Sequence, residues 1–423
     1  MKKVLFITYF WPPSGKASLH WPLKMIKYLP DSGWQPYVLT VTEDTFTQKD
    51  ESLLKEIDKN LSVIKTKSFE PFDIYKKFTG KAKNEQLIAS ETISRTNKSL
   101  AHRISIWIRM NLFIPDARIG WFFSAVIAGN NLLKKEKFDA IISVGPPHTS
   151  HVIGMRISKR NRIPLIPVFI DPWVDIAYYR EFKRSRLTLA IDHHLEKSVM
   201  KNAASIIFVT RTMKDDYTNK YDFIKAKSEV LYWGYNEEDF NKVELKNRAS
   251  DGDLIVHSGN IFDFQNPKNF WKMLKEEIEN GRKLRIKFIG TVSPGIKEEI
   301  GKNCLMPYTE YIGFLPYDQL LNELSLATYL LVCATEKRHV PGKLFEYMRT
   351  GKPIIAFGDD NEEVKSILAE SNAGMIFNYN ESGKELFEKT PQLRTNLAAV
   401  EKFDRKNIAK ELANILSKVP GKD

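Results

Sequence analysis

The sequence has little cysteine and no long apolar run. Its 423 residues include only Cys304 and Cys333, which stand far apart and form no paired motif. This pattern disfavours a disulfide framework or a cysteine-based zinc site, and it is typical of a protein from a reducing cytosol. No run approaches the ~18–20 apolar residues that a membrane-spanning helix requires. We therefore expect a cytoplasmic protein that can attach peripherally to a membrane.

The sequence also offers little to bind a metal. It has no histidine–carboxylate cluster, and its one Asp-x-Asp sequence, Asp251-Gly252-Asp253, lies in an acidic stretch before a strand. We expect no metal and no resident cofactor. The apolar start, Val4–Phe10, ends at Trp11-Pro12-Pro13 without a small-residue cleavage site, so we interpret it as a buried strand rather than a signal peptide.

Positive charge is in excess and unevenly placed. The net charge is +12, which favours an anionic partner: a nucleotide, a phospholipid surface or a nucleic acid. Between Lys65 and Arg118 there are eleven Lys/Arg against five Asp/Glu. Within this segment Leu100, Ile104 and Trp107 share one helical face, and aromatic and basic residues alternate upstream at 74–78. This pattern fits an interfacial helix on an anionic leaflet or, equally, helices that cover a sheet.

Strand-like apolar runs alternate with helical patterns along the whole chain. Such alternation predicts an α/β fold with two doubly wound parallel sheets. The predicted domains are 1–235, with a basic and aromatic insertion at 65–118, and 254–400, joined by an acidic linker at 236–253. Residues 401–423 form an amphipathic helix that we expect to pack back on the first domain. The predicted strands are Val4–Phe10, Gln35–Val41, Ala140–Val144, Leu165–Ile170, Ser205–Thr210, Glu229–Tyr232, Leu254–His257, Arg285–Ile289, Thr309–Ile312, Tyr329–Cys333, Ile354–Phe357 and Ala373–Ile376.

The most informative stretch is Pro341–Ala356, PGKLFEYMRTGKPIIA. Gly342 opens a short helix, Gly351 ends it, and a buried strand follows Pro353. A helix start at the end of a parallel strand can bind an anion, Lys343 can pair with phosphate, and Glu346 can accept hydrogen bonds from a vicinal diol such as ribose. These features suit a nucleotide diphosphate. An ordinary βαβ crossover with a glycine cap remains the alternative.

The same stretch resembles the donor-site signature P-x-K-x-x-E-Y-M-x-x-G-K-P of family 4 glycosyltransferases, which have the GT-B fold. Four further segments resemble the family's motifs in the same order along the chain: the loop at Trp11–Ala17, Ser143–His151, Asp171-Pro172-Trp173, and the glycine loop at His257–Asn260. The resemblance implies a GT-B fold with a cleft between two Rossmann-like domains. It also implies metal-independent transfer, with retention, of a sugar from a nucleotide-diphosphate sugar to a glycan or lipid-linked acceptor, as in bacterial envelope polysaccharide synthesis.

The resemblance also implies roles for individual residues. His151, Glu346 and Lys268 are the expected catalytic residues. The expected donor-binding residues are Gly259, Asn260, Gly290, Gly313, Leu315, Gly342, Lys343 and Glu346. The expected acceptor or phosphate loop residues are Gly15, Lys16, His20, His148 and Asp171.

Several positions depart from the family pattern. Arg338 stands eight residues before Glu346, where many members carry a second glutamate, and Glu336 lies two residues further upstream. Ile170 replaces an arginine, and Asn260 stands where a basic residue is frequent. These departures leave open a non-catalytic GT-B protein that serves as the partner of an active transferase. Nucleic-acid binding rests on charge alone, without a recognisable module, so we expect no nucleic-acid partner.

Overall fold

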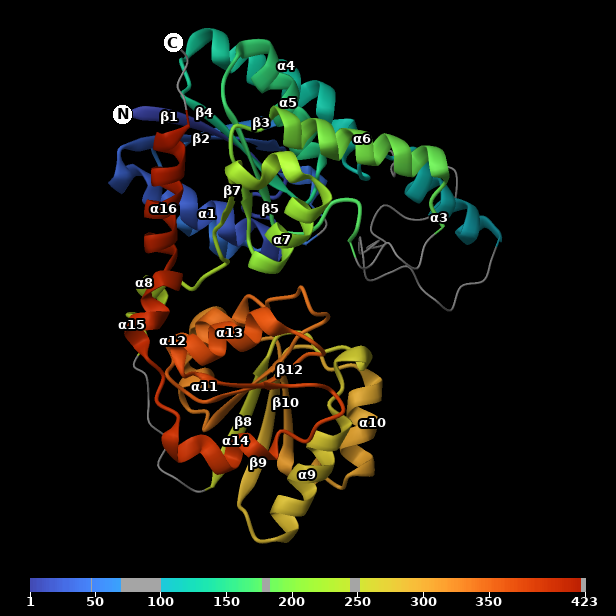
Figure 1. Cartoon of the computed structure of the whole chain (residues 1–423), viewed down its shortest axis with the longest axis vertical. Helices are drawn as coiled ribbons and strands as arrows, with labels where there is room; N and C mark the ends of the chain where they lie inside the picture. Colours follow the sequence, from blue (N-terminus) through green and yellow to red (C-terminus); the bar gives the residue numbers. More distant parts are fainter. Residues whose placement is uncertain (47, 70–99, 177–182, 244–251, 420–423) are drawn as a thin grey trace. The chain divides into compact units, whose positions relative to one another are not determined.

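The chain divides into two compact units. The computed structural model describes residues 1–46, 48–69, 100–176, 183–243 and 252–419 (Figure 1). Unit 1 comprises Met1–Leu231 together with the residues from Ala409 onward, and unit 2 comprises Tyr232–Ile408. The division thus falls a few residues before the predicted boundary at 235, because Tyr235 is buried in the core of unit 2 and Tyr232 and Trp233 pack against that core. Helix α8 (Glu237–Phe240) follows and buries Phe240 in the same core. Of the predicted linker, residues 244–251 lie outside the described part.

Unit 1 is built on a seven-stranded sheet in which all the pairings are parallel. The strand order is β3-β2-β1-β4-β5-β6-β7, so the direction of winding reverses between β1 and β4. At such a switch point the loops after the two strands diverge and leave room for a ligand. The strands are β1 (Lys2–Ile7), β2 (Trp34–Val41), β3 (Ser62–Thr66), β4 (Ala140–Gly145), β5 (Leu165–Phe169), β6 (Ile206–Phe208) and β7 (Ser228–Val230).

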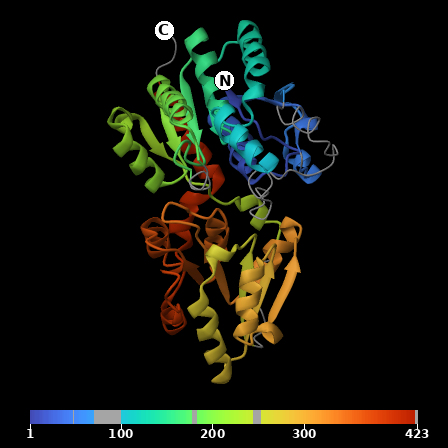
Figure 2. The same ribbon diagram turned by 90° about the vertical axis from the view of Figure 1, so that its right-hand side faces the viewer.

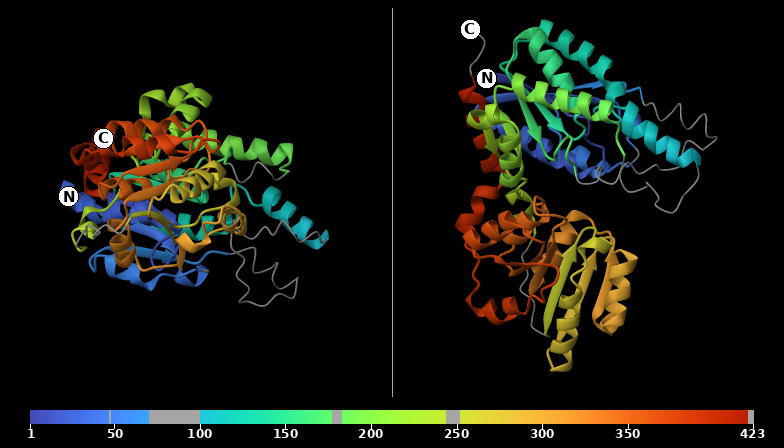
Figure 3. Two further views of the ribbon diagram at one scale, coloured as in Figure 1. Left: turned by 90° about the horizontal axis from the view of Figure 1, so that it is seen from below. Right: turned by 45° about the vertical axis from the view of Figure 1, so that its right-hand side comes forward.

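Helices cover this sheet, and α4, α5 and α6 lie side by side (Figures 1 and 3). Leu5, Ile7 and Leu39 of the sheet pack against Ala125 of α4 and Ile153 of α5 in one buried cluster. The helices of unit 1 are α1 (His20–Tyr28), α3 (Leu100–Leu112), α4 (Phe122–Lys135), α5 (Thr149–Asn161), α6 (Arg186–Asn202) and α7 (Arg211–Lys220).

Unit 2 repeats the plan with a six-stranded parallel sheet in the order β10-β9-β8-β11-β12-β13, which reverses between β8 and β11. Its strands are β8 (Asp253–Ser258), β9 (Leu284–Ile289), β10 (Thr309–Gly313), β11 (Tyr329–Cys333), β12 (Ile354–Phe357) and β13 (Gly374–Phe377). Its other helices are α9 (Lys268–Glu279), α10 (Pro294–Lys302), α11 (Tyr317–Ser325), α12 (Lys343–Arg349), α13 (Glu362–Ser371), α14 (Lys384–Lys389) and α15 (Leu397–Val400).

Alternation along the strands of unit 2 makes two separate cores. Leu330 and Val332 of β11 point into the cluster under α11, α12 and α13, whereas Leu331 and Cys333 point into the cluster under α9 and α10. Figure 2 shows helices on both sides of this sheet. Two sheets of this type confirm the predicted two-domain Rossmann-like architecture.

The predicted strands are all present, with ends shifted by a few residues. β1 ends at Ile7 rather than Phe10. The Thr8 N–H still donates to the Leu39 carbonyl oxygen of β2 at 3.1 Å, but the Thr8 hydroxyl donates to the Phe10 carbonyl oxygen as the chain turns into the loop. The structure adds β3 (Ser62–Thr66), which has no counterpart among the predicted strands and takes up the start of the basic segment 65–118. Residues 70–99 of that segment, and the side chains of 100–105, lie outside the described part.

The last helix, α16 (Arg405–Lys418), has the predicted amphipathic pattern. Ile408, Leu412 and Leu416 are buried along one face. The helix begins in unit 2, and its residues from Ala409 onward are grouped with unit 1. Among the described helices, none is long and apolar enough to cross a membrane.

Candidate functional site

Two glycine loops and the start of α12 meet at the carboxyl edge of the sheet in unit 2. Gly259 follows β8 with φ +85°, and Gly290 follows β9 with φ +125°, both in the region that favours glycine. A Cβ on Gly290 would lie 2.5 Å from the Gly259 carbonyl oxygen, and one on Gly259 would lie 3.0 Å from Lys343 Nζ. The structure therefore brings Gly259, Gly290 and Lys343 together, and side chains at either glycine would crowd the space in front of the lysine.

Lys343 is the first residue of α12, and its ammonium group is anchored to β8. Nζ donates to the Ser258 carbonyl oxygen and lies 3.5 Å from His257 Nε2. His257 Nδ1 lies 2.9 Å from the Leu331 carbonyl oxygen, which can only accept, so we assign the hydrogen to Nδ1 and the free lone pair to Nε2. Burial lowers the pKa of Lys343 to about 8. Burial, and then the nearby Lys343 charge, holds the pKa of His257 well below its usual range.

Glu346 lies one turn after Lys343 on the same helix. Its Oε1 accepts a hydrogen bond from the Tyr317 hydroxyl at 2.9 Å. Burial raises the pKa of Glu346, while Arg405 and the Tyr317 hydrogen bond lower it. Tyr317 begins α11, four residues after Gly313, whose φ of +78° ends β10. The carboxylate is thus fixed by a partner from the loop that follows Gly313.

The other predicted donor-site residues differ in their surroundings. Gly342 packs against Trp233, and a Cβ there would lie 2.8 Å from the Trp233 Cδ1 atom. Leu315 is half-buried against the core beneath α12, whereas its neighbour Phe314 is 89% exposed. Asn260 and Lys268 are both exposed, and no hydrogen bond or ion pair of the described residues joins the Lys268 side chain to the Lys343 cluster.

The loop before α12, which carries Arg338, is closed on itself. The Thr335 N–H donates to His339 Nδ1 at 2.9 Å, and Asn361 Nδ2 donates to the carbonyl oxygens of Glu336 and His339. Burial lowers the pKa of His339 to about 4, and the Lys343 charge adds to this effect. The tight turn therefore places the neutral imidazole of His339 near Lys343. Arg338 stands eight residues before Glu346, at the position where the sequence pattern led us to look for a glutamate.

No metal-binding group appears among the described residues. These residues contain no group of three or more His, Cys, Asp or Glu that could hold an ion. Of the Asp-x-Asp sequence, Asp251 lies outside the described residues, and Asp253 accepts a hydrogen bond from Arg282 Nε at 2.7 Å.

In unit 1, the loop after β4 and the first turn of α5 carry two buried histidines, His148 and His151. His151 Nδ1 lies 2.9 Å from Ser143 Oγ, and the His148 ring stacks on Trp173 with centroids 5.0 Å apart and planes 5° apart. Burial lowers the pKa of His148 to about 3 and that of His151 well below its usual range, so both rings are neutral. A Cβ on Gly145 would lie 2.5 Å from His151 Nε2, so only glycine fits beneath them.

Several polar atoms at this edge of the sheet are buried without a partner. In the described part of the chain, Trp11 Nε1, Ser150 Oγ and His151 Nε2 have no hydrogen-bond partner. Trp11 follows β1 and the other two follow β4, the strands between which the sheet reverses. Buried polar groups are normally satisfied, so unpartnered ones at a switch point indicate a place for a polar ligand.

The remaining predicted residues of unit 1 flank this place. Gly15 is exposed and its N–H donates to the Gln48 carbonyl oxygen at 3.0 Å, while Lys16 and His20 are half-buried beside it. Asp171 follows β5, and burial raises its pKa to about 6. The structure brings His148, His151 and the Asp171–Trp173 loop together. It places Gly15 and Lys16 in the neighbouring loop after β1 and His20 at the start of α1.

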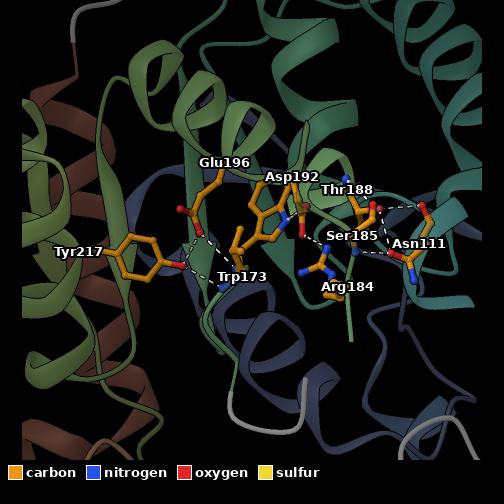
Figure 4. Close-up of polar contacts among 9 residues, drawn as sticks. Asn111, Trp173, Arg184, Ser185, Thr188, Asp192, Glu196 and Tyr217 are labelled. Carbon is orange, nitrogen blue, oxygen red and sulfur yellow. Dashed lines mark hydrogen bonds and ion pairs between the residues drawn. The ribbon is translucent and has the colours of Figure 1, made fainter. Parts of the chain in front are cut away.

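A buried network that was not predicted holds the Asp171–Trp173 loop (Figure 4). Trp173 Nε1 donates to Asp192 Oδ1 at 2.7 Å, and the Trp173 N–H donates to the Tyr217 hydroxyl at 2.8 Å. Tyr217 in turn donates to Glu196, and Asp192 pairs with Arg184. The sequence carried a signal for this network: Asp192 and Glu196 stand four apart on α6, on its buried face.

Asp116 is a second residue that sequence reasoning missed. Its carboxylate accepts hydrogen bonds from the Thr149 N–H at 2.9 Å and from Thr149 Oγ1 at 2.8 Å. These bonds satisfy the first turn of α5, the helix that carries His151. Asp116 lies in the basic segment 65–118. Nothing in the sequence around Asp116 predicts that its carboxylate contacts a helix more than thirty residues away.

With both sites described, comparison with known proteins decides the family. A sequence profile of Glycosyltransferase Family 4 matches residues 23–239, more than half of the chain. The chain belongs to this glycosyltransferase family. A search of curated proteins finds no relative that matches the sequence.

Solved structures agree on the fold. Sucrose-phosphate synthase from Thermosynechococcus elongatus has 11% sequence identity and a TM-score of 0.62, with 99% of each chain covered. HepE from Anabaena in complex with UDP has 13% identity and a TM-score of 0.63, with 99% of this chain and all of that chain covered. A glycosyltransferase from Rickettsia africae has 13% identity and a TM-score of 0.61, with 99% and 98% covered. The chain is a GT-B glycosyltransferase.

Proposed function

We propose that the protein transfers a sugar from a nucleotide-diphosphate sugar to a glycan or lipid-linked acceptor, with retention and without a metal. We place this activity in the synthesis of a bacterial envelope polysaccharide, at the inner face of the cytoplasmic membrane. The proposed binding of the sugar donor rests on one observation. Gly259, Gly290, Lys343 and Glu346 all lie at one edge of the sheet of unit 2. Solved structures of HepE with UDP and with UDP-glucose lend support, because they have the same fold.

In unit 2, Gly259 and Gly290 have no side chains, so a diphosphate can approach the backbone of their loops closely. Lys343 supplies the positive charge that pairs with it. Breaking the bond between the sugar C1 and the phosphate oxygen places negative charge on the diphosphate, so a fixed ammonium there stabilises the transition state more than the ground state. Glu346 lies one turn further along α12 and can accept hydrogen bonds from the two ribose hydroxyls. Tyr317 holds that carboxylate in place from α11.

In unit 1, the polar atoms at the switch point suit an acceptor rich in hydroxyls. His151 and His148 are neutral, so they can accept or donate hydrogen bonds without carrying a charge. In a retaining transfer the new bond joins C1 to the acceptor oxygen, and the hydroxyl proton passes to the departing diphosphate oxygen. No residue of the protein then has to act as a base, which agrees with buried histidines that resist protonation.

Thermal stabilisation by a panel of UDP-, GDP-, ADP- and CMP-linked sugars tests the donor half. We expect one nucleotide to raise the unfolding temperature, and Glu346→Ala to abolish that shift. Glu362→Ala, at an exposed position of α13 in the same unit, is the matched control and should keep it. A folded protein that no donor stabilises would contradict the proposal, and stabilisation without turnover on any acceptor would indicate a non-catalytic partner of another transferase.

A further inference from the structure

Helices α3 and α6 of unit 1 carry exposed apolar side chains that no part of the proposed reaction uses. Trp107 and Leu112 of α3 are 52% and 62% exposed, and Leu187 and Ile191 of α6 are 71% and 41% exposed. We call these four side chains the α3–α6 apolar patch. Single exposed apolar residues are common on proteins, but a group of this size on adjoining helices marks an interaction surface.

Hydrogen bonds join the two helices next to Leu112 and Leu187, so the exposed apolar side chains come from neighbouring parts of the chain. The Ser185 N–H donates to Asn111 Oδ1 at 2.6 Å, and Thr188 Oγ1 donates to the Asn111 carbonyl oxygen at 3.2 Å (Figure 4). Leu112 directly follows Asn111, and Leu187 directly precedes Thr188. The end of α3 and the start of α6 are therefore fixed side by side, as Figures 1 and 3 also show.

Among the described side chains of α3 and α6, those with an exposed charge are all basic. Both carboxylates of α6, Asp192 and Glu196, are fully buried, whereas Arg186, Lys197 and Lys201 of the same helix are exposed. The sequence of α3, LAHRISIWIRMNL, contains no acidic residue. A helix face that only needs to stay in water normally mixes both signs, whereas apolar residues interleaved with cations suit the surface of an anionic bilayer.

The buried side of α6 is directly connected to the predicted acceptor loop. Ile191 of the patch is followed by Asp192, whose Oδ1 accepts the Trp173 Nε1 hydrogen bond at 2.7 Å. Trp173 lies two residues after Asp171 and stacks on His148. One helix thus carries exposed apolar side chains and also fixes the loop of Asp171 through the bond between Asp192 and Trp173.

We propose that the α3–α6 apolar patch inserts into the headgroup region of an anionic lipid bilayer, and that the sugar acceptor is a lipid-linked molecule of that bilayer. The second part rests on the proposed function, and the first does not. This surface differs from the helical face expected from the sequence, because half of it comes from α6, outside the basic segment 65–118.

Co-sedimentation with vesicles tests the docking surface on the full chain. We expect binding to phosphatidylcholine vesicles that contain phosphatidylglycerol, weaker binding at high salt, and little binding to phosphatidylcholine alone. Leu187→Glu should weaken the binding about tenfold or more, since it removes an apolar side chain that inserts into the bilayer and adds a negative charge that the anionic lipids repel. Leu397→Glu makes the same change at an exposed leucine of unit 2 and should leave binding unchanged.

Three results would overturn the docking surface: equal binding to neutral vesicles, no binding to either kind, or an equal loss in both glutamate variants. A wild-type dimer that Leu187→Glu converts to a monomer would assign the patch to a second copy of the chain instead. Donor stabilisation is measured on the same samples without vesicles, and Leu187→Glu should retain it. Vesicle binding without donor stabilisation would refute the proposed function alone, whereas donor stabilisation without vesicle binding would refute the docking surface alone.

Discussion

The Tyr347 hydroxyl and Ser258 exchange two hydrogen bonds that join α12 to the end of β8. The hydroxyl accepts from the Ser258 N–H at 2.7 Å and donates to Ser258 Oγ at 3.0 Å. Both residues are buried, and Lys343 and Glu346 lie on the same helix as Tyr347. Because Gly259 directly follows Ser258, this pair fixes the distance between the glycine loop and the two charged residues.

Tyr347→Phe should therefore destabilise unit 2 and loosen the site. It leaves a buried N–H and a buried hydroxyl without partners, which costs about 1–3 kcal/mol. We expect a lower unfolding temperature and weaker donor stabilisation. Tyr308→Phe, which removes the hydroxyl of an exposed tyrosine in the same unit, is the control. Equal unfolding temperatures for the two variants would contradict the structural role of the pair.

Lys343 should make donor binding dependent on pH. Its pKa of about 8 lies below the ordinary value of 10.5, so the folded protein holds fewer protons than the unfolded chain between these values. The free energy of unfolding therefore rises with pH across this window, whereas affinity for a diphosphate falls, because the diphosphate needs the ammonium form. Near pH 8, binding should take up about half a proton, measured by calorimetry in buffers of different ionisation enthalpy.

Lys343→Arg provides the control for proton uptake, since guanidinium stays charged over this range. We expect the arginine variant to bind without taking up a proton. Uptake of the same size in both proteins would assign the proton to another group and contradict the role of Lys343.

Asp171 should destabilise unit 1 when it is charged. Its pKa of about 6 lies above the ordinary value of 3.8, so the folded protein holds more protons than the unfolded chain between these values. Stability therefore falls as the pH rises through that window. Asp171→Asn should raise the unfolding temperature near neutral pH, and the gain should shrink towards pH 4. Asp222→Asn, at an exposed aspartate of the same unit, should show no such trend. A destabilised Asp171→Asn at neutral pH would be the contrary result.

Gly145→Ala should disturb the two histidines. Its Cβ would lie 2.5 Å from His151 Nε2 and 2.9 Å from His148 Nδ1, so both rings must shift, at a cost of about 1–3 kcal/mol. Gly301→Ala, in α10 with nothing within 4 Å of the new Cβ, is the matched control. We expect a lower unfolding temperature for the first variant only, and equal behaviour of the two would show that the rings have more room than the structure indicates.

The sequence predicted the fold because the strands are short apolar runs with glycine or proline at their ends. Ile354–Phe357 has the bounds predicted, since Gly351 and Pro353 leave the chain no other local choice. β3 was missed because Ser62–Thr66 lies at the edge of its sheet and has only two apolar residues, Val63 and Ile64, too few for a recognisable apolar run.

The sites were predicted only where local motifs carry them. Lys343 and Glu346 share one helix, so the sequence spacing alone predicts that they lie one turn apart. His257, Tyr317 and Trp233 come from other elements, and the sequence does not specify their contacts with this helix. Phe314 could be interpreted as a core residue from its apolar character, yet the turn at Gly313 directs it to the solvent. The roles predicted for the site residues, among them Lys268, His20 and Asn260, stay predictions.

The central claim is that the α12 cluster of unit 2 binds a nucleoside diphosphate and that Glu346 binds its ribose. A binding cycle tests this most directly: the dissociation constants of wild type and Glu346→Gln for the nucleoside diphosphate that stabilises best and for its 2′,3′-dideoxy analogue. We expect the missing hydroxyls to weaken binding to the wild type about tenfold, and to make little difference to Glu346→Gln. Equal losses in both proteins would place the ribose elsewhere and contradict the account.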